Sequence, residues 1–125
     1  MSIQPKPLIA EHRQVLTKAV LNAAEILGLN QAALAAALGI SPASVSRMRA
    51  GEYLIPQRSK EWELASLLVR LYRGLDAIMA GDEQSLRAWM QNPNTDLNAI
   101  PATLVAQVAG LVNTVEYVDA HRARV

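Results

Sequence analysis

Serine and arginine side chains gather in one short stretch of the chain, SPASVSRMR at residues 41–49. Serine hydroxyls and arginine guanidinium groups form hydrogen bonds that suit the recognition of phosphates and of nucleic-acid base edges. Arg47 is long enough to reach the edge of a guanine with two parallel hydrogen bonds. The stretch therefore indicates binding chemistry rather than chemistry that makes or breaks covalent bonds.

Residues for catalysis or metal binding do not form usable groups in the sequence. His12 and His121 are far apart, and neither has a companion at the spacing of metal ligands. Glu61 and Glu63 lie two positions apart, so a helix would point them to different sides. The sequence contains no cysteine, no glycine-rich phosphate loop and no nucleophile motif. We therefore predict that the chain is not an enzyme and uses no cofactor or metal.

Length and composition limit the architecture. A chain of 125 residues forms one domain, or two very small ones that share a core. The hydrophobic content of 51% is ample for such a core, which must be built from Ala, Leu and Val because phenylalanine is absent. No apolar run approaches the roughly 18 residues of a membrane span, and the N-terminus lacks a signal-peptide pattern. With no cysteine to form disulfides, these features predict a cytoplasmic protein.

The charge is distributed unevenly along the chain. Residues 1–60 carry seven Lys and Arg against three Asp and Glu, whereas residues 61–125 carry five against eight. The first part therefore has a net charge of +4 and the second of −3, although the whole chain has only +1. A basic part and an acidic part can face different partners.

Apolar periodicity predicts an all-α fold, a compact helical bundle. Leu16, Val20 and Leu27 share one face of a helix over residues 8–27, which Gly28 ends. Further helices are predicted to begin at the capping residues Asn30, Ser41, Ser59 and Asp82 and at Pro101. The helix that starts at Asn30 is expected to end at Ala37, the one from Ser41 at Gly51, and the long one from Ser59 at about Met79. The helix from Pro101 is expected to be interrupted at Gly110.

The short helices on either side of Gly39 have the features of a helix-turn-helix. Two such helices cross at roughly 90–120°, and glycine can adopt the positive φ that the turn needs. Ala35 lets the helices approach closely, and Ile40 and Val45 fill the angle between them. The helix that follows Gly39 then has an outer face that can enter the major groove of DNA. That face consists of Pro42, Ala43, Ser44, Ser46, Arg47 and Arg49.

This helix-turn-helix resembles that of the Xre/Cro/phage-repressor family. The matching pattern is Gln31-x-x-Leu34-Ala35-x-x-Leu38-Gly39-Ile40-Ser41-x-x-x-Val45-Ser46-x-x-x-x-Gly51. The resemblance implies that Gln31 touches a phosphate and that Ala43, Ser44 and Arg47 face base edges. Pro42 and Ala43 stand where relatives often carry glutamine, so sequence readout would depend on the serines and arginines or on DNA shape. The predicted DNA-binding residues are Gln31, Ser41, Ala43, Ser44, Ser46, Arg47 and Arg49.

Alternatives remain open for this half. The stretch could be an alanine-rich helical hairpin whose arginines are only solvated. Arg58 and Lys60, just past the following loop, are either further phosphate contacts or solvated charges. Because one helix-turn-helix makes few phosphate contacts, specific binding predicts a homodimer with half-sites about 34 Å apart.

Residues 86–118 resemble the C-terminal domain of the Xre/ParS/MbcA-type antitoxins. The positions that carry the resemblance are Trp89, Met90, Asn92, Pro93, Asn94, Leu97, Pro101, Leu104, Gly110, Val115 and Tyr117. The resemblance implies that the chain is encoded beside a toxin, often a RES-domain protein that consumes NAD. It also implies that the chain binds this toxin through its C-terminal part and represses their shared promoter.

The same motif suggests a rigid surface for the toxin. Pro93 and Pro101 fix a loop, Asn92 and Asn94 can hydrogen-bond their own backbone, and Trp89 can anchor it. The last helix is expected to project a tip into a toxin cleft built for an anionic dinucleotide, which would block the substrate. The predicted toxin-binding residues are Trp89, Asn94, Tyr117, His121, Arg122, Arg124 and Val125. A core anchor is the alternative for Trp89, and solvent exposure is the alternative for the arginines.

We expect a DNA-binding domain over residues 8–75 and a small helical toxin-binding domain over residues 76–125. The helix over residues 60–79 carries apolar residues around more than one face, which favours a homodimer or a seam between the two modules. Two other functions remain possible: a stand-alone dimeric transcriptional repressor, and a protein-interaction module that has lost DNA binding. Loss of affinity with rising salt would identify a DNA binder.

Overall fold

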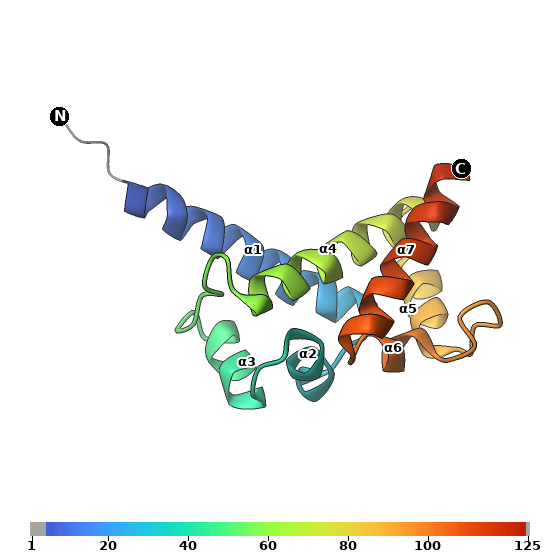
Figure 1. Cartoon of the computed structure of the whole chain (residues 1–125), viewed down its shortest axis with the longest axis horizontal. Coiled ribbons are helices and arrows are strands. Elements are labelled where there is room, and N and C mark those ends of the chain that lie inside the picture. Colours follow the sequence, from blue (N-terminus) through green and yellow to red (C-terminus); the bar gives the residue numbers. More distant parts are fainter. Residues whose placement is uncertain (1–4, 125) are drawn as a thin grey trace.

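The computed structural model of the chain describes the backbone of residues 5–124 and the side chains of residues 11–123. Its helices are α1 (Pro5–Leu27), α2 (Gln31–Leu38), α3 (Pro42–Arg49), α4 (Lys60–Ile78), α5 (Glu83–Gln91), α6 (Pro101–Leu104) and α7 (Val108–Arg124) (Figure 1). The predicted all-α fold is confirmed, and extended pairing within residues 5–124 is limited to one isolated antiparallel bridge between Asn94 and Ala99. None of the described helices is long and apolar enough to cross a membrane.

Four helices begin where the sequence places a capping side chain. The side-chain oxygens of Asn30, Ser41, Ser59 and Asp82 each accept a hydrogen bond from a backbone N–H two or three residues further on. Such bonds satisfy N–H groups that the first turn of a helix leaves without partners. The predicted starts of α2, α3, α4 and α5 are therefore confirmed.

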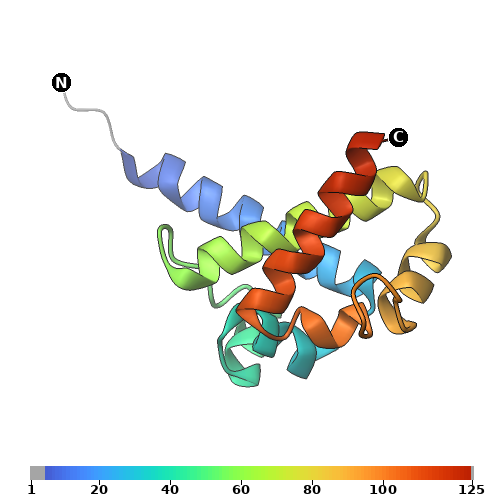
Figure 2. The ribbon, with the colours of Figure 1, turned by 45° about the vertical axis from the view of Figure 1, so that its right-hand side comes forward.

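Helix α4 is the central element of the fold. Figure 2 shows α7 crossing in front of α4 and α1 passing behind it, and both helices pack against it. A Cβ atom at Gly74 would lie 2.7 Å from Cγ1 of Val118, so this glycine lets α7 approach α4 closely. The second apolar face of α4 is thus covered by α7 of the same chain, which favours the seam between modules. The homodimer stays a prediction.

One hydrophobic core extends through both halves of the chain. Its fully buried members include Val20, Leu27, Leu34, Leu38, Val45, Leu68, Leu71, Leu75, Leu86, Met90 and Leu111. The predicted boundary between residues 75 and 76 falls inside α4. The two predicted domains therefore share a core. The boundary between a DNA-binding part and a toxin-binding part stays a prediction.

The expected interruption at Gly110 is wrong. The break lies at residues 105–107, between α6 and α7, and Gly110 is inside the first turn of α7. A Cβ atom at Gly110 would overlap the backbone carbonyl oxygen of Leu104. The glycine is needed because α7 starts in contact with the end of α6, and it does not end a helix.

Candidate functional site

The turn between α2 and α3 has the geometry that the sequence predicts for a helix-turn-helix. Gly39 adopts a left-handed backbone conformation with φ of 69°, which residues with a Cβ rarely adopt. The backbone N–H of Ile40 then donates to the carbonyl of Ala35 at 3.0 Å. Ala35 and Val45 are buried at 2% and 0% exposure, so small and branched side chains close the angle between the helices as expected.

The outer face of α3 is accessible to solvent. Val45 and Met48 turn into the core, while Pro42, Ala43, Ser46, Arg47 and Arg49 are exposed and Ser44 is half-buried. The positions predicted to face DNA therefore lie together on one accessible surface. Their contact with DNA stays a prediction.

Three of these predicted residues are joined by hydrogen bonds. The Ser41 Oγ accepts from the backbone N–H of Ser44 at 3.1 Å, and the two serine Oγ atoms lie 3.0 Å apart. The Nη2 of Arg47 donates to Ser44 Oγ at 3.0 Å. The sequence indicated each of these residues separately and gave no sign that they form a chain of hydrogen bonds.

Gln31 connects the starts of the two helices. Its Nε2 donates to the backbone carbonyl of Pro42 at 2.9 Å, and the side chain is exposed. The structure thus gives Gln31 a role in placing α3 relative to α2. An amide nitrogen has two protons, so the predicted phosphate contact is compatible with this bond and stays a prediction.

The loop after α3 is held to α1 by residues that the sequence analysis missed. Arg13 donates from Nη2 to the carbonyl of Leu54 at 2.8 Å and from Nε to that of Ile55 at 3.0 Å. The N–H of Ile55 donates to Oγ1 of Thr17 at 3.1 Å. These partners are about 40 positions apart in the sequence, so no local pattern could have indicated them.

Two further charges border this loop. Arg58 is exposed and, with Arg13, Pro56 and Gln57, lines a surface depression of about 450 Å³. Lys60 is exposed and lies 3.5 Å from the carboxylate of Glu63. Both side chains are accessible to a phosphate, and neither is in the core.

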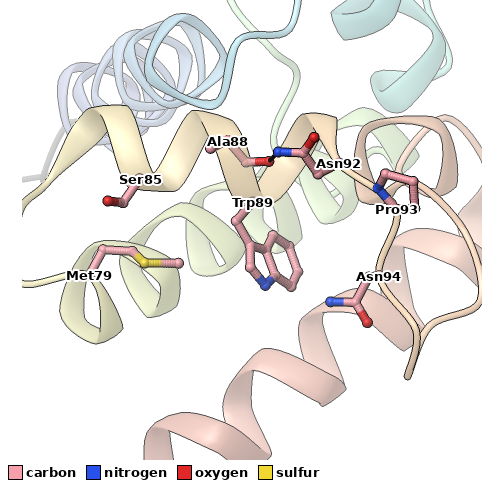
Figure 3. A pocket seen from close by; sticks show the side chains of 7 residues that line it. All are labelled: Met79, Ser85, Ala88, Trp89, Asn92, Pro93 and Asn94. Atoms are coloured by element: carbon pink, nitrogen blue, oxygen red, sulfur yellow. Dashed lines mark hydrogen bonds between the residues drawn. The ribbon is translucent and has the colours of Figure 1, made fainter.

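The C-terminal half contains a second surface of interest, a pocket of about 320 Å³ beside Trp89. Figure 3 shows Trp89 extending from α5 between Met79, at the end of α4, and Asn94 in the following loop. Asn92 donates from Nδ2 to the carbonyl of Ala88 at 2.6 Å, and Asn94 accepts through Oδ1 from the N–H of Leu97 at 3.0 Å. The expected hydrogen bonds from these asparagines to nearby backbone are confirmed.

An aromatic cluster lies against this pocket. The rings of Trp89 and Tyr117 stack with centroids 6.4 Å apart, and the rings of Tyr117 and His121 lie 4.2 Å apart. The Tyr117 hydroxyl donates to Asp96 at 2.6 Å, which ties α7 to the loop after α5. Trp89 is therefore half-buried: it stacks on Tyr117 and lines the pocket.

The position of Tyr117 and His121 differs from the expected projecting tip. Both side chains are half-buried, and both line a small cavity of about 70 Å³ together with Trp89. Tyr117 faces Trp89 of α5 and Asp96 of the loop after α5. Arg122 is exposed. The Arg124 side chain and Val125 lie outside the described residues.

Comparison with known protein families matches both halves of the chain. Residues 8–70 match the antitoxin Xre-like helix-turn-helix domain. Residues 75–124 match the antitoxin Xre/MbcA/ParS C-terminal toxin-binding domain. No curated protein matches the chain.

Proposed function

The chain belongs to the Xre-like antitoxins, and we propose that it neutralises a RES-like, NAD-consuming toxin and represses the operon that encodes both proteins. The observation that carries this proposal is the order of the two matched regions, a helix-turn-helix followed by a toxin-binding domain on one chain. A stand-alone repressor would need only the first region and a dimer surface.

The proposed toxin surface is the pocket beside Trp89 together with the exposed end of α7. Several features support it: Trp89 lines the pocket, hydrogen bonds fix the asparagine loop, and Tyr117 joins this loop to α7. A preformed surface loses little conformational freedom on binding. We therefore propose that Trp89, Asn94, Tyr117 and His121 form the base of the interface and that Arg122, Arg124 and Val125 contact the toxin at its active site.

The proposed DNA surface lies at the other end of the molecule. Figure 1 places the end of α7 far from α3, so the two surfaces do not overlap. One chain can therefore bind a toxin and an operator at the same time. We propose that the DNA-bound form is a homodimer, because an operator with two half-sites requires a two-fold symmetric protein. The proposed location is the cytoplasm, where an operator would be found.

The first experiment is to induce each neighbouring reading frame with and without this chain, while growth and cellular NAD are measured. The proposal expects one neighbour to stop growth and deplete NAD, and co-expression of the chain to restore both. Arrest without NAD loss would keep the antitoxin and discard the RES-like toxin. If no neighbour is toxic, the chain is a stand-alone repressor.

Trp89 gives a matched test of the toxin surface, because the chain has only one other tryptophan, Trp62. Trp62 is also half-buried but lies on α4 beside Glu63 and Ser66, in another part of the surface. The Trp89→Ala variant should lose neutralisation, while Trp62→Ala should keep it. Circular dichroism of both variants checks that each remains folded. Equal neutralisation by both would place the toxin surface elsewhere.

Binding to DNA is tested by selecting duplexes from a random pool and measuring affinity at several salt concentrations. Affinity should fall as salt rises, since phosphate binding releases counterions. Arg47→Ala should weaken binding to the selected duplex by about 1–3 kcal/mol and relax the preference at one base pair. An equal loss on unrelated duplexes would make Arg47 a phosphate contact.

A further inference from the structure

Two serines lie two residues apart in α3 but have different surroundings. The Ser46 side chain is exposed and makes no hydrogen bond with the described part of the chain. Ser44 is half-buried, and its Oγ lies 3.0 Å from Arg47 Nη2 and 3.0 Å from Ser41 Oγ. Ser46 therefore offers a free hydroxyl, whereas the hydroxyl of Ser44 is already hydrogen-bonded.

The direction of the bond between Arg47 and Ser44 follows from the chemistry of the groups, whereas either hydroxyl can donate in the bond between Ser44 and Ser41. A guanidinium can only donate, so Ser44 Oγ accepts from Arg47. With the Ser44 hydroxyl proton directed to Ser41 Oγ, the bonds run from Arg47 to Ser44 to Ser41, and each bond polarises the next. In this arrangement the Ser44 hydroxyl has no proton left to donate to a base or a phosphate.

The bond to Ser44 also determines where the Arg47 guanidinium lies. Helical side chains point toward the N-terminus of their own helix, and Ser44 lies one turn before Arg47 in that direction. The N-terminal end of the second helix of a helix-turn-helix is the end that meets base edges. A guanidinium has five N–H donors, so enough remain for two parallel bonds to a guanine.

We infer that Ser44 is a positioning residue, which orients Arg47 for base recognition and does not contact a base itself. The inference rests on the proposed DNA binding and names the residue that shapes its specificity. An unrestrained arginine loses rotamer freedom when it binds, so a restrained one binds its base with a smaller loss. Ser44 thus raises the affinity for the preferred DNA sequence and leaves the general attraction to phosphates unchanged.

The orientation is first tested on the full chain without DNA. Nuclear magnetic resonance relaxation of the arginine Nε–H groups compares Arg47 with Arg49, which is exposed and has no partner among the described residues. Arg47 should be the more ordered of the two, and Ser44→Ala should lower it to the level of Arg49. Ser46→Ala should change nothing, and Ser44→Thr should restore the order because it keeps a hydroxyl. Equal disorder of both arginines in the unmodified chain would overturn the inference.

The role in recognition is tested with the duplex selected above. Ser44→Ala should weaken binding to it by roughly three- to tenfold, keep the affinity for unrelated duplexes, and have no further effect in a chain that already carries Arg47→Ala. A full effect of Ser44→Ala in that background would mean that Ser44 contacts DNA directly, which overturns the inference alone. Failure of the unmodified chain to select any duplex overturns the proposed DNA binding together with the inference.

Discussion

The Asp82 side chain caps the start of α5 with several hydrogen bonds. Its carboxylate accepts from the N–H groups of Gln84 and Ser85 at 3.1 and 3.2 Å and from the Ser85 hydroxyl at 2.8 Å. The Ser85 hydroxyl is the main cause, and the backbone bonds a further cause, of a pKa of Asp82 below its ordinary value of 3.8. The charged form is therefore favoured in the folded chain.

The pKa of Asp82 predicts a loss of stability in acid. Because the folded pKa lies below the unfolded value, the contribution of the carboxylate is complete above about pH 5 and is lost as the pH falls through the folded pKa. An NMR titration should place the midpoint of Asp82 below 3.8. Ser85→Ala should move it upward, because it removes the largest cause. A midpoint at or above 3.8 in the unmodified chain would contradict the assignment.

Gly110 predicts a large effect from the addition of one methyl group. Gly110→Ala should lower the free energy of unfolding by about 1–3 kcal/mol, since the new Cβ would overlap the Leu104 carbonyl oxygen. Gly81→Ala is the control, because it meets no atom within 4 Å and loses only the preference for positive φ, about 1 kcal/mol. Urea denaturation measures both values. A smaller loss for Gly110→Ala than for Gly81→Ala would show that α6 and α7 separate easily.

At the scale of elements, helix starts could be predicted from the sequence and contacts between elements could not. Ser59 and Asp82 cap their helices through bonds to residues two or three positions away, so the signal is local. Gly110 looked like a helix break, but its role is to make room for the backbone of Leu104, which belongs to another helix. Likewise the bond from Tyr117 to Asp96 joins residues 21 positions apart. The sequence therefore indicated the residues of the site better than their arrangement.

Helix α5 is attached to the end of α1 by two side chains. Arg87 donates from Nη2 to the carbonyl of Glu25 at 2.7 Å and from Nε to that of Ile26 at 3.1 Å, and Gln91 lies 3.4 Å from the carbonyl of Gly28. The last carbonyls of a helix lack partners within the helix and carry a partial negative charge. A cation is therefore well placed there.

This attachment predicts a modest but specific loss of stability. Arg87→Ala should lower the free energy of unfolding by about 1 kcal/mol, because the side chain is exposed and its bonds compete with water. Arg73→Ala should have little effect, since Arg73 is exposed and has no partner within the described chain. Urea denaturation compares the two variants. Equal losses would mean that the charge matters and the bonds do not.

At the scale of the whole molecule, the shared core predicts a single unfolding transition. Trp62 in α4 and Trp89 in α5 report on different halves. Their fluorescence, measured separately in Trp89→Phe and Trp62→Phe variants, should give coincident denaturation curves once each variant's own stability is allowed for. Transitions of different steepness, with one half unfolding before the other, would show that the predicted domains fold independently.

Helix α4 packs against both α1 and α7, so a protease cut within this helix would not leave either half of the described chain intact. A cut within α4 opens the core on both sides, and the fragment with α2 and α3 loses its support along with the fragment that carries Trp89. Degradation through α4 would therefore end the proposed promoter silencing and the proposed toxin restraint in the same event. The proposed repression and the proposed toxin neutralisation would then share one lifetime, that of the intact chain.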